Sequence, residues 1–138
     1  MTPSQITDKM MDSDYFSQWL GIRRIKDEMG ACVLQMTLRK DMLNGFGIAH
    51  GGITFSFADS ALAFASNSYG RKAVSIETSI SHIAPLYEGD IITAEAIEES
   101  CTNRIAIYRV LICNQKNEKI ALFKGTVFRT EKEWKGEA

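Results

Sequence analysis

The sequence of 138 residues contains little cysteine and proline and no excess charge of either sign. Its three cysteines, Cys32, Cys101 and Cys113, are widely spaced and odd in number, so they indicate neither a disulfide framework nor a zinc site. Sixteen Lys and Arg are balanced by seventeen Asp and Glu. Nucleic acid and anionic membranes are therefore not expected as partners, because surfaces that bind them carry a marked excess of positive charge.

Long apolar runs are also lacking. The longest, residues 53–65, is interrupted by Ser56, Asp59 and Ser60, and it is shorter than the roughly 20 residues that a membrane-spanning helix needs. The first residues do not show the basic segment followed by an apolar core that is typical of a signal peptide. We therefore expect a cytoplasmic protein with reduced cysteines and no membrane partner.

Several motifs that would indicate a cofactor or a nucleophile are absent. Gly45 and Gly47 begin like a dinucleotide-binding fingerprint, but His50 stands where the third glycine belongs. No G-x-S-x-G sequence and no P-loop occur. The two histidines, His50 and His82, are not at a metal-ligand spacing. We expect no metal and no bound cofactor.

What is present fits one globular domain over residues 1–138, since 45% of the residues are hydrophobic and 24% are charged. Residues 4–20 have apolar side chains at helical spacing, which predicts a short amphipathic helix with 12–14 as the place for a break. Residues 22–29 are predicted to form an edge strand. Residues 31–39 alternate like a strand and follow a turn at Gly30.

The second half of the sequence predicts one helix and four strands. Residues 51–68 are apolar on nearly every side and too many for one buried strand, so they indicate a central, buried helix. Strands are expected over 72–83, 90–99, 104–114 and 119–130, with a charged, frayed tail over 131–138. The predicted class is α+β, with one antiparallel sheet and a long helix on one of its faces.

Asp59 is the unusual residue of the predicted central helix, because its neighbours include Phe57, Ala58 and Leu62. An ionised carboxylate that is buried without a partner is costly. Two interpretations stay open on the residues alone. Asp59 is a reactive acid held in apolar surroundings, or it is a structural residue that reaches solvent or bonds a nearby loop.

The segment His50-Gly51-Gly52 immediately precedes that helix. The first N–H groups of a helix have no helical partner, and the helix dipole favours negative charge there. Glycine also lets another group approach the backbone closely. The segment suits an oxyanion or a thioester carbonyl, although a plain loop-to-helix turn with a capping His50 explains the same residues.

Together these residues resemble those of the hotdog-fold acyl-CoA thioesterases, and most closely the phenylacetic-acid-degradation (PaaI-type) branch. The resemblance rests on Asn44, His50-Gly51-Gly52 and Asp59 at their joint spacing. Four further segments look like that branch and extend the similarity over nearly the whole chain: 42–45, 55–59, 84–90 and 121–125. The resemblance implies a hotdog fold, in which a curved antiparallel sheet wraps a long central helix.

The resemblance also implies roles for five residues. Asp59 corresponds to the acid that activates water or attacks the thioester, and the Gly51 N–H to the group that polarises the carbonyl. Asn44 and His50 correspond to polar residues that orient the carbonyl or the water. Ser75 matches a position where some relatives place a water-orienting hydroxyl. The implied substrate is an acyl-CoA with a small aryl-acetyl or hydroxyphenylacetyl group, so coenzyme A enters as part of the substrate.

Helix geometry indicates a site shared between chains without appeal to the family. Gly51 and Asp59 are eight residues apart, which places them about 12 Å apart along a helix. A carboxylate and an oxyanion donor that serve one carbonyl must both lie within a few ångströms of it. We therefore expect at least a homodimer with two equivalent sites, and the resemblance suggests a tetramer of two dimers.

Two other functions stay open. A catalytically silent acyl-CoA-binding or regulatory hotdog module would share the fold, although ligand binding alone does not need a buried acid. An acyl-CoA hydratase or dehydratase would need a His and an acid that act together. His50 at the start of the predicted helix is a poor fit for this chemistry, and His82 on a predicted strand lacks a marked acidic partner.

Overall fold

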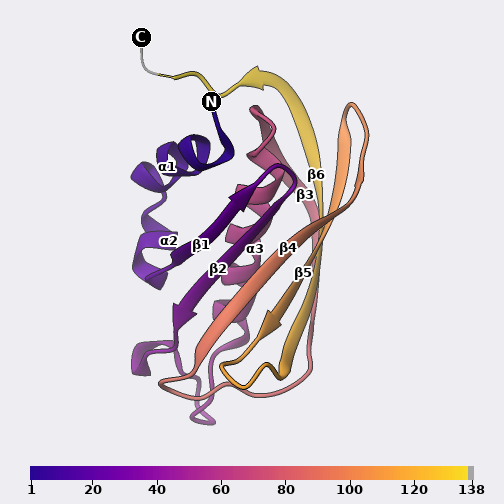
Figure 1. The fold of residues 1–138 in the computed structure, drawn as a ribbon. Coiled ribbons are helices and arrows are strands. Elements are labelled where there is room, and N and C mark those ends of the chain that lie inside the picture. Colours follow the sequence, from indigo (N-terminus) through magenta and orange to yellow (C-terminus); the bar gives the residue numbers. More distant parts are fainter. Residues whose placement is uncertain (137–138) are drawn as a thin grey trace.

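The computed structural model describes residues 1–136 and consists of one six-stranded antiparallel sheet with three α-helices (Figure 1). The strands are arranged in the order β1-β2-β4-β5-β6-β3. This arrangement confirms the predicted α+β class. The elements are α1 (Pro3–Ser13), α2 (Tyr15–Leu20), β1 (Arg23–Glu28), β2 (Ala31–Thr37), the 3₁₀ helix η1 (Lys40–Met42), α3 (Gly51–Asn67), β3 (Arg71–His82), β4 (Ile91–Cys101), β5 (Ile105–Cys113) and β6 (Lys119–Glu133).

The N-terminal helix is broken where the sequence indicates. Asp14 ends α1 and also caps α2, because its Oδ1 accepts a hydrogen bond from the Ser17 N–H at 3.0 Å. Gly21 ends α2 in the left-handed conformation with φ of 74°, which glycine adopts without steric cost. Both helices lie on the same side of the sheet as α3 (Figure 1).

The central helix α3 supplies many of the buried side chains of the hydrophobic core. Its Phe57, Leu62 and Phe64 are almost fully buried. They pack against the inward-facing side chains of β2, which are those at the alternate positions Cys32, Leu34 and Met36. One core between the helix and the sheet thus explains why apolar side chains alternate along β2 and why α3 is apolar on nearly every side.

The C-terminal end differs from the expectation of a frayed tail that begins at residue 131. Strand β6 continues to Glu133 because it stays paired with the start of β3, where Arg71 is opposite Glu133. Beyond the strand, the Trp134 N–H donates to the Gly70 carbonyl at 2.8 Å, and Trp134 Nε1 donates to Asn67 Oδ1 at 2.8 Å. The end of the predicted tail, 137–138, lies outside the described residues.

No helix among residues 1–136 is long and apolar enough to cross a membrane.

Gly125 sits where β6 touches α3, and it offers a test of this packing. A Cβ at this position would overlap the side chain of Leu62, which is 1% exposed and has little room to move. Gly125→Ala should therefore lower the free energy of unfolding by about 1–3 kcal/mol, the usual cost of overpacking a core. Denaturant unfolding measures the change. Gly45→Ala is the control, since a Cβ there meets no atom within 4 Å, and equal stability of the two variants would contradict the packing.

Candidate active site

The start of α3 presents one backbone donor without a partner. His50 caps the helix, with its Nδ1 accepting from the Gly52 N–H at 2.9 Å and its carbonyl accepting from the Ile53 N–H at 2.9 Å. No acceptor within residues 1–136 takes the hydrogen of Gly51 N. The Gly51 N–H is therefore available at the positive end of the helix dipole.

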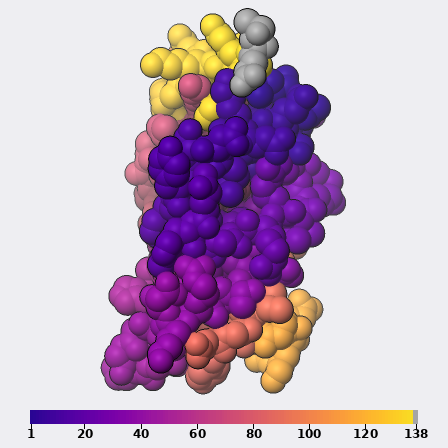
Figure 2. Space-filling view, turned by 90° about the vertical axis from the view of Figure 1, so that its left-hand side faces the viewer, coloured from indigo at the N-terminus to yellow at the C-terminus, as the bar shows by residue number. Residues whose placement is uncertain are grey.

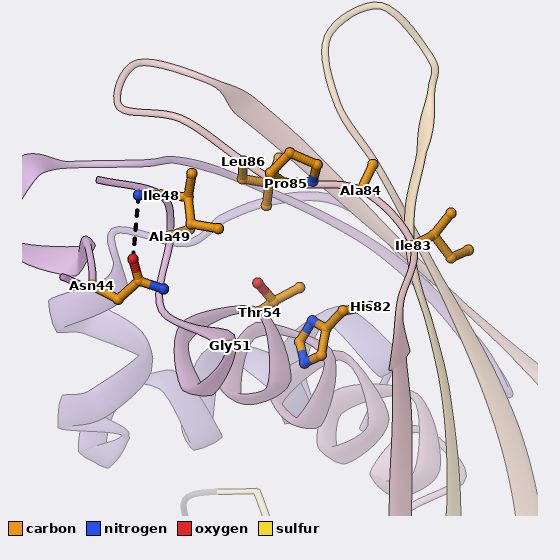
Figure 3. A pocket seen from close by; sticks show the side chains of 10 residues that line it. All are labelled: Asn44, Ile48, Ala49, Gly51, Thr54, His82, Ile83, Ala84, Pro85 and Leu86. Carbon is orange, nitrogen blue, oxygen red and sulfur yellow. Dashed lines mark hydrogen bonds between the residues drawn. The ribbon is translucent and has the colours of Figure 1, made fainter. Parts of the chain in front are cut away.

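A cavity of about 400 Å³ opens beside this donor (Figure 3). His82, at the end of β3, lies directly over Gly51, because a Cβ on Gly51 would be 3.1 Å from His82 Nε2. Glycine therefore leaves space between the backbone and this ring that a side chain would narrow. The other lining residues are Asn44, Ile48, Ala49, Thr54, Ile83, Ala84, Pro85 and Leu86.

Asn44 is held rigidly at the edge of this cavity. Its Oδ1 accepts hydrogen bonds from the Phe46 N–H at 2.9 Å and from the Ile48 N–H at 3.4 Å. These bonds fix the loop that follows Asn44 and use the amide oxygen. The side-chain nitrogen is turned toward the start of α3 (Figure 3) and remains a donor for a bound group.

Asp59 lies in the middle of α3 and lines a separate, small cavity of about 50 Å³. Ser75 of β3 lines the same cavity, so the structure brings these two predicted residues together. Burial raises the pKa of the Asp59 carboxyl above its ordinary value of 3.8, and the negative charge of Asp14 raises it further. No hydrogen bond to the carboxylate opposes these effects among the described residues.

Asp14 belongs to this environment through a short chain of hydrogen bonds. The Ser17 Oγ donates to Asp14 Oδ2 at 2.6 Å and lies 2.8 Å from the Oγ of Ser60, the residue after Asp59. The chain fixes the second carboxylate against α3. The sequence indicates only the break in the helix at this position, since nothing local to Asp14 shows which residue of α3 it faces.

Within one chain the predicted site residues therefore form two groups. Gly51 and Asn44 share the cavity at the start of α3, together with His82. Asp59 and Ser75 share the other cavity. His50 caps the helix with an exposed side chain. His82 was not predicted as a site residue, because only the return of β3 to the start of α3 places it there.

Comparisons with known proteins agree with this architecture. The profile of the Thioesterase superfamily matches residues 46–121. The chain belongs to the thioesterase superfamily. It is a PaaI-type hotdog protein and a hydrolase that acts on thioester bonds, as the resemblance implied.

Three relatives show how far the likeness extends. The acyl-coenzyme A thioesterase PaaI of Escherichia coli is 37% identical over 94% of this chain and 92% of its own length. Its solved structure superposes with a TM-score of 0.93 and covers 95% of each chain. A mutant of PaaI from Thermus thermophilus is 38% identical and superposes with a TM-score of 0.82. The match covers 85% of this chain and 100% of the Thermus chain. A Streptococcus mutans protein solved with acetyl-CoA is 25% identical, with a TM-score of 0.80 over 82% of this chain and 91% of its own.

The raised pKa of Asp59 predicts a dependence of stability on pH. A carboxyl whose pKa is higher in the folded state binds its proton more tightly there. The Asp59 carboxyl therefore lowers the free energy of unfolding as the pH rises from below 3.8 through the folded-state pKa, because the folded protein holds the proton longer than the unfolded chain does. Asp59→Asn removes this cost, so the variant should be more stable than wild type at pH 7, and the difference should disappear toward pH 3. Denaturant unfolding at fixed protein concentration measures both values.

Asp12→Asn is the matched control for this titration, because Asp12 is exposed. That variant should show no comparable gain at pH 7. A stability difference between Asp59→Asn and wild type that stays constant from pH 7 to pH 3 would show that the charge of Asp59 is not the cause.

Proposed function

We propose that the protein hydrolyses acyl-CoA thioesters whose acyl group is a small aryl-acetyl or hydroxyphenylacetyl group. The observation that carries the proposal is the Asp59 carboxylate. It lies in a small cavity with a raised pKa and without a hydrogen-bonding partner among the described residues. A structural acid would be expected to have a partner there, whereas an acid that serves a substrate needs its oxygen atoms free.

The proposed reaction needs only water and groups of this protein. Asp59 accepts a proton from water as the water oxygen attacks the thioester carbonyl, and the Gly51 N–H stabilises the oxyanion that forms. The carbon–sulfur bond then breaks, and the thiolate leaves as the thiol with the proton from Asp59. In the alternative route Asp59 attacks the carbonyl itself and the carbon–sulfur bond breaks, which releases the CoA thiolate and leaves an anhydride. Water then hydrolyses the anhydride to the free acid and the Asp59 carboxylate, and a proton released in that step converts the thiolate to the thiol. Asn44, His50 and Ser75 orient the carbonyl or the water.

Each site is proposed to take Asp59 from one subunit and Gly51 from its partner, since one helix holds them about 12 Å apart. Strand β3 supports this arrangement because it lies at the edge of the sheet, next to both cavities. Its outer backbone groups are available to pair with a second copy. Val74 and Ile76 on β3 are 56% and 58% exposed, which a dimer would cover, and two dimers would make the tetramer.

Two observations support the proposed acyl group. The cavity beside Gly51 has apolar walls from Ile48, Ile83 and Leu86 and a volume of about 400 Å³, which suits one aromatic ring better than a long chain. The E. coli relative comes from the phenylacetic acid degradation operon. The hydratase alternative has less support, because no carboxylate among the described residues lines the cavity that holds His82.

A panel of acyl-CoA substrates tests the proposed function. Asp59→Asn should lower kcat on the best substrate by roughly a hundredfold or more, the usual scale for the loss of a positioned acid–base group. Release of the free thiol measures the rate, and phenylacetyl-CoA and hydroxyphenylacetyl-CoA should exceed acetyl-CoA and long-chain acyl-CoA in kcat/KM.

Asp12→Asn again serves as the control and should retain the wild-type rate. A wild-type rate in Asp59→Asn would remove this residue from the mechanism. A wild-type protein that binds acyl-CoA without releasing thiol would favour the non-catalytic binding module instead.

A further inference from the structure

A third cavity lies at the opposite end of α3 from Gly51 and is lined by residues of α1 and of the C-terminal end of β6. These two segments lie side by side, in indigo and yellow, in Figure 2. The cavity has a volume of about 480 Å³. Four lysines and one tryptophan dominate its lining. These residues are Lys9, Lys72, Lys132, Lys135 and Trp134, and we call the cavity that they line the lysine pocket.

The lysine pocket carries an excess of positive charge. None of its four lysines forms an ion pair with a carboxylate within residues 1–136. Glu131 and Glu133 also line the cavity, but Glu131 pairs with Arg104 at 2.7 Å. The lining thus holds four ammonium groups and two carboxylates, one of which is already paired with Arg104. This excess of positive charge attracts an anion.

The tryptophan of the pocket is held in a fixed position. Its Nε1 donates to Asn67 Oδ1, and its backbone N–H donates to the Gly70 carbonyl, each at 2.8 Å. Asn67 is buried and also accepts from the Ala73 N–H at 3.0 Å. The Lys72 ammonium lies 4.7 Å from the centre of the indole ring. A fixed aromatic ring next to ammonium groups suits a ligand with both phosphates and a base.

The lysine pocket is adjacent to the cavity of Asp59. Asn67, which holds Trp134, is eight residues beyond Asp59 on α3, a distance of about 12 Å along the helix. On β3, Lys72 of the pocket is followed by Ala73, which lines the Asp59 cavity. The phosphopantetheine arm of coenzyme A is long enough to span this separation.

We propose that the lysine pocket binds the phosphorylated nucleotide end of the CoA thioester whose carbonyl lies beside Asp59 of the same chain. The ammonium groups contact the phosphates, and the adenine lies against the part of the Trp134 ring that Lys72 does not cover. This inference rests on the proposed function for its acyl end. The nucleotide end is recognised by a separate set of residues and is tested separately.

Two thioesters of the same acyl group separate the nucleotide contact from catalysis. One is the full CoA thioester, and the other is the N-acetylcysteamine thioester, which lacks phosphates and adenine. The double variant Lys132→Glu with Lys135→Glu should raise KM for the CoA thioester by roughly tenfold or more and leave kcat unchanged, because it removes uniform binding. KM for the short thioester should not change.

The matched control is Lys116→Glu with Lys119→Glu, which reverses two exposed charges around the β5–β6 turn, away from the pocket. It should leave KM unchanged for both thioesters. Equal KM for the CoA thioester in the pocket variant and wild type would overturn the inference. An equal rise in KM for both thioesters would also overturn it, because the nucleotide would then not be the group recognised.

Calorimetry with free CoA keeps the test independent of hydrolysis. Wild type should bind CoA more tightly than the pocket variant does, and inorganic phosphate at the same concentration should not displace it. If wild type hydrolyses neither thioester, the proposed function fails while this binding difference still tests the pocket. If phosphate alone displaces CoA, the pocket is a general anion site and the inference is wrong.

Discussion

The rigidity of α3 is the constraint on which the proposed site depends. Gly51 begins this helix and Asp59 lies two turns further along, so their separation of about 12 Å cannot change without breaking backbone hydrogen bonds. The core on one side of α3 and the sheet around it hold the helix in place. A single carbonyl can contact only one of the two groups within a chain. The proposed site therefore takes the other group from a second copy, and the edge strand β3 runs beside both cavities.

The same packing raises the pKa of Asp59, which suits its proposed role as a base and makes its ionised form costly to the fold. Apolar neighbours on α3 and the fixed Asp14 carboxylate both disfavour the ionised form. A carboxyl with a raised pKa is a stronger base than an exposed aspartate, which suits proton transfer near neutral pH. Stability and the proposed function thus make opposite demands on this position. The hydrogen bonds from Asp14 through Ser17 to Ser60 keep the second carboxylate in place.

Local signals explain which features could be predicted from the sequence. The break near Asp14, the turn at Gly30 and the helix from Gly51 were predicted from side-chain spacing, from a glycine between two strands and from the length of an apolar run, and each is confirmed. The end of β6 was predicted too early because its charged residues show no alternation, while pairing with β3 and the bonds of Trp134 hold it in place. The positions of His82 over Gly51 and of Asp14 beside α3 arise from contacts between distant segments, which no local pattern indicates.

Mixing two inactive variants tests the shared site most directly. Asp59→Asn lacks the acid, and Gly51→Val blocks the carbonyl site because a side chain there would meet His82. After subunit exchange, a mixed dimer has one site with both lesions and one site with neither. Equal mixing gives about half mixed dimers, so roughly a quarter of wild-type activity should return. If mass spectrometry shows mixed dimers and no activity returns, each site is built within one chain and the account is wrong.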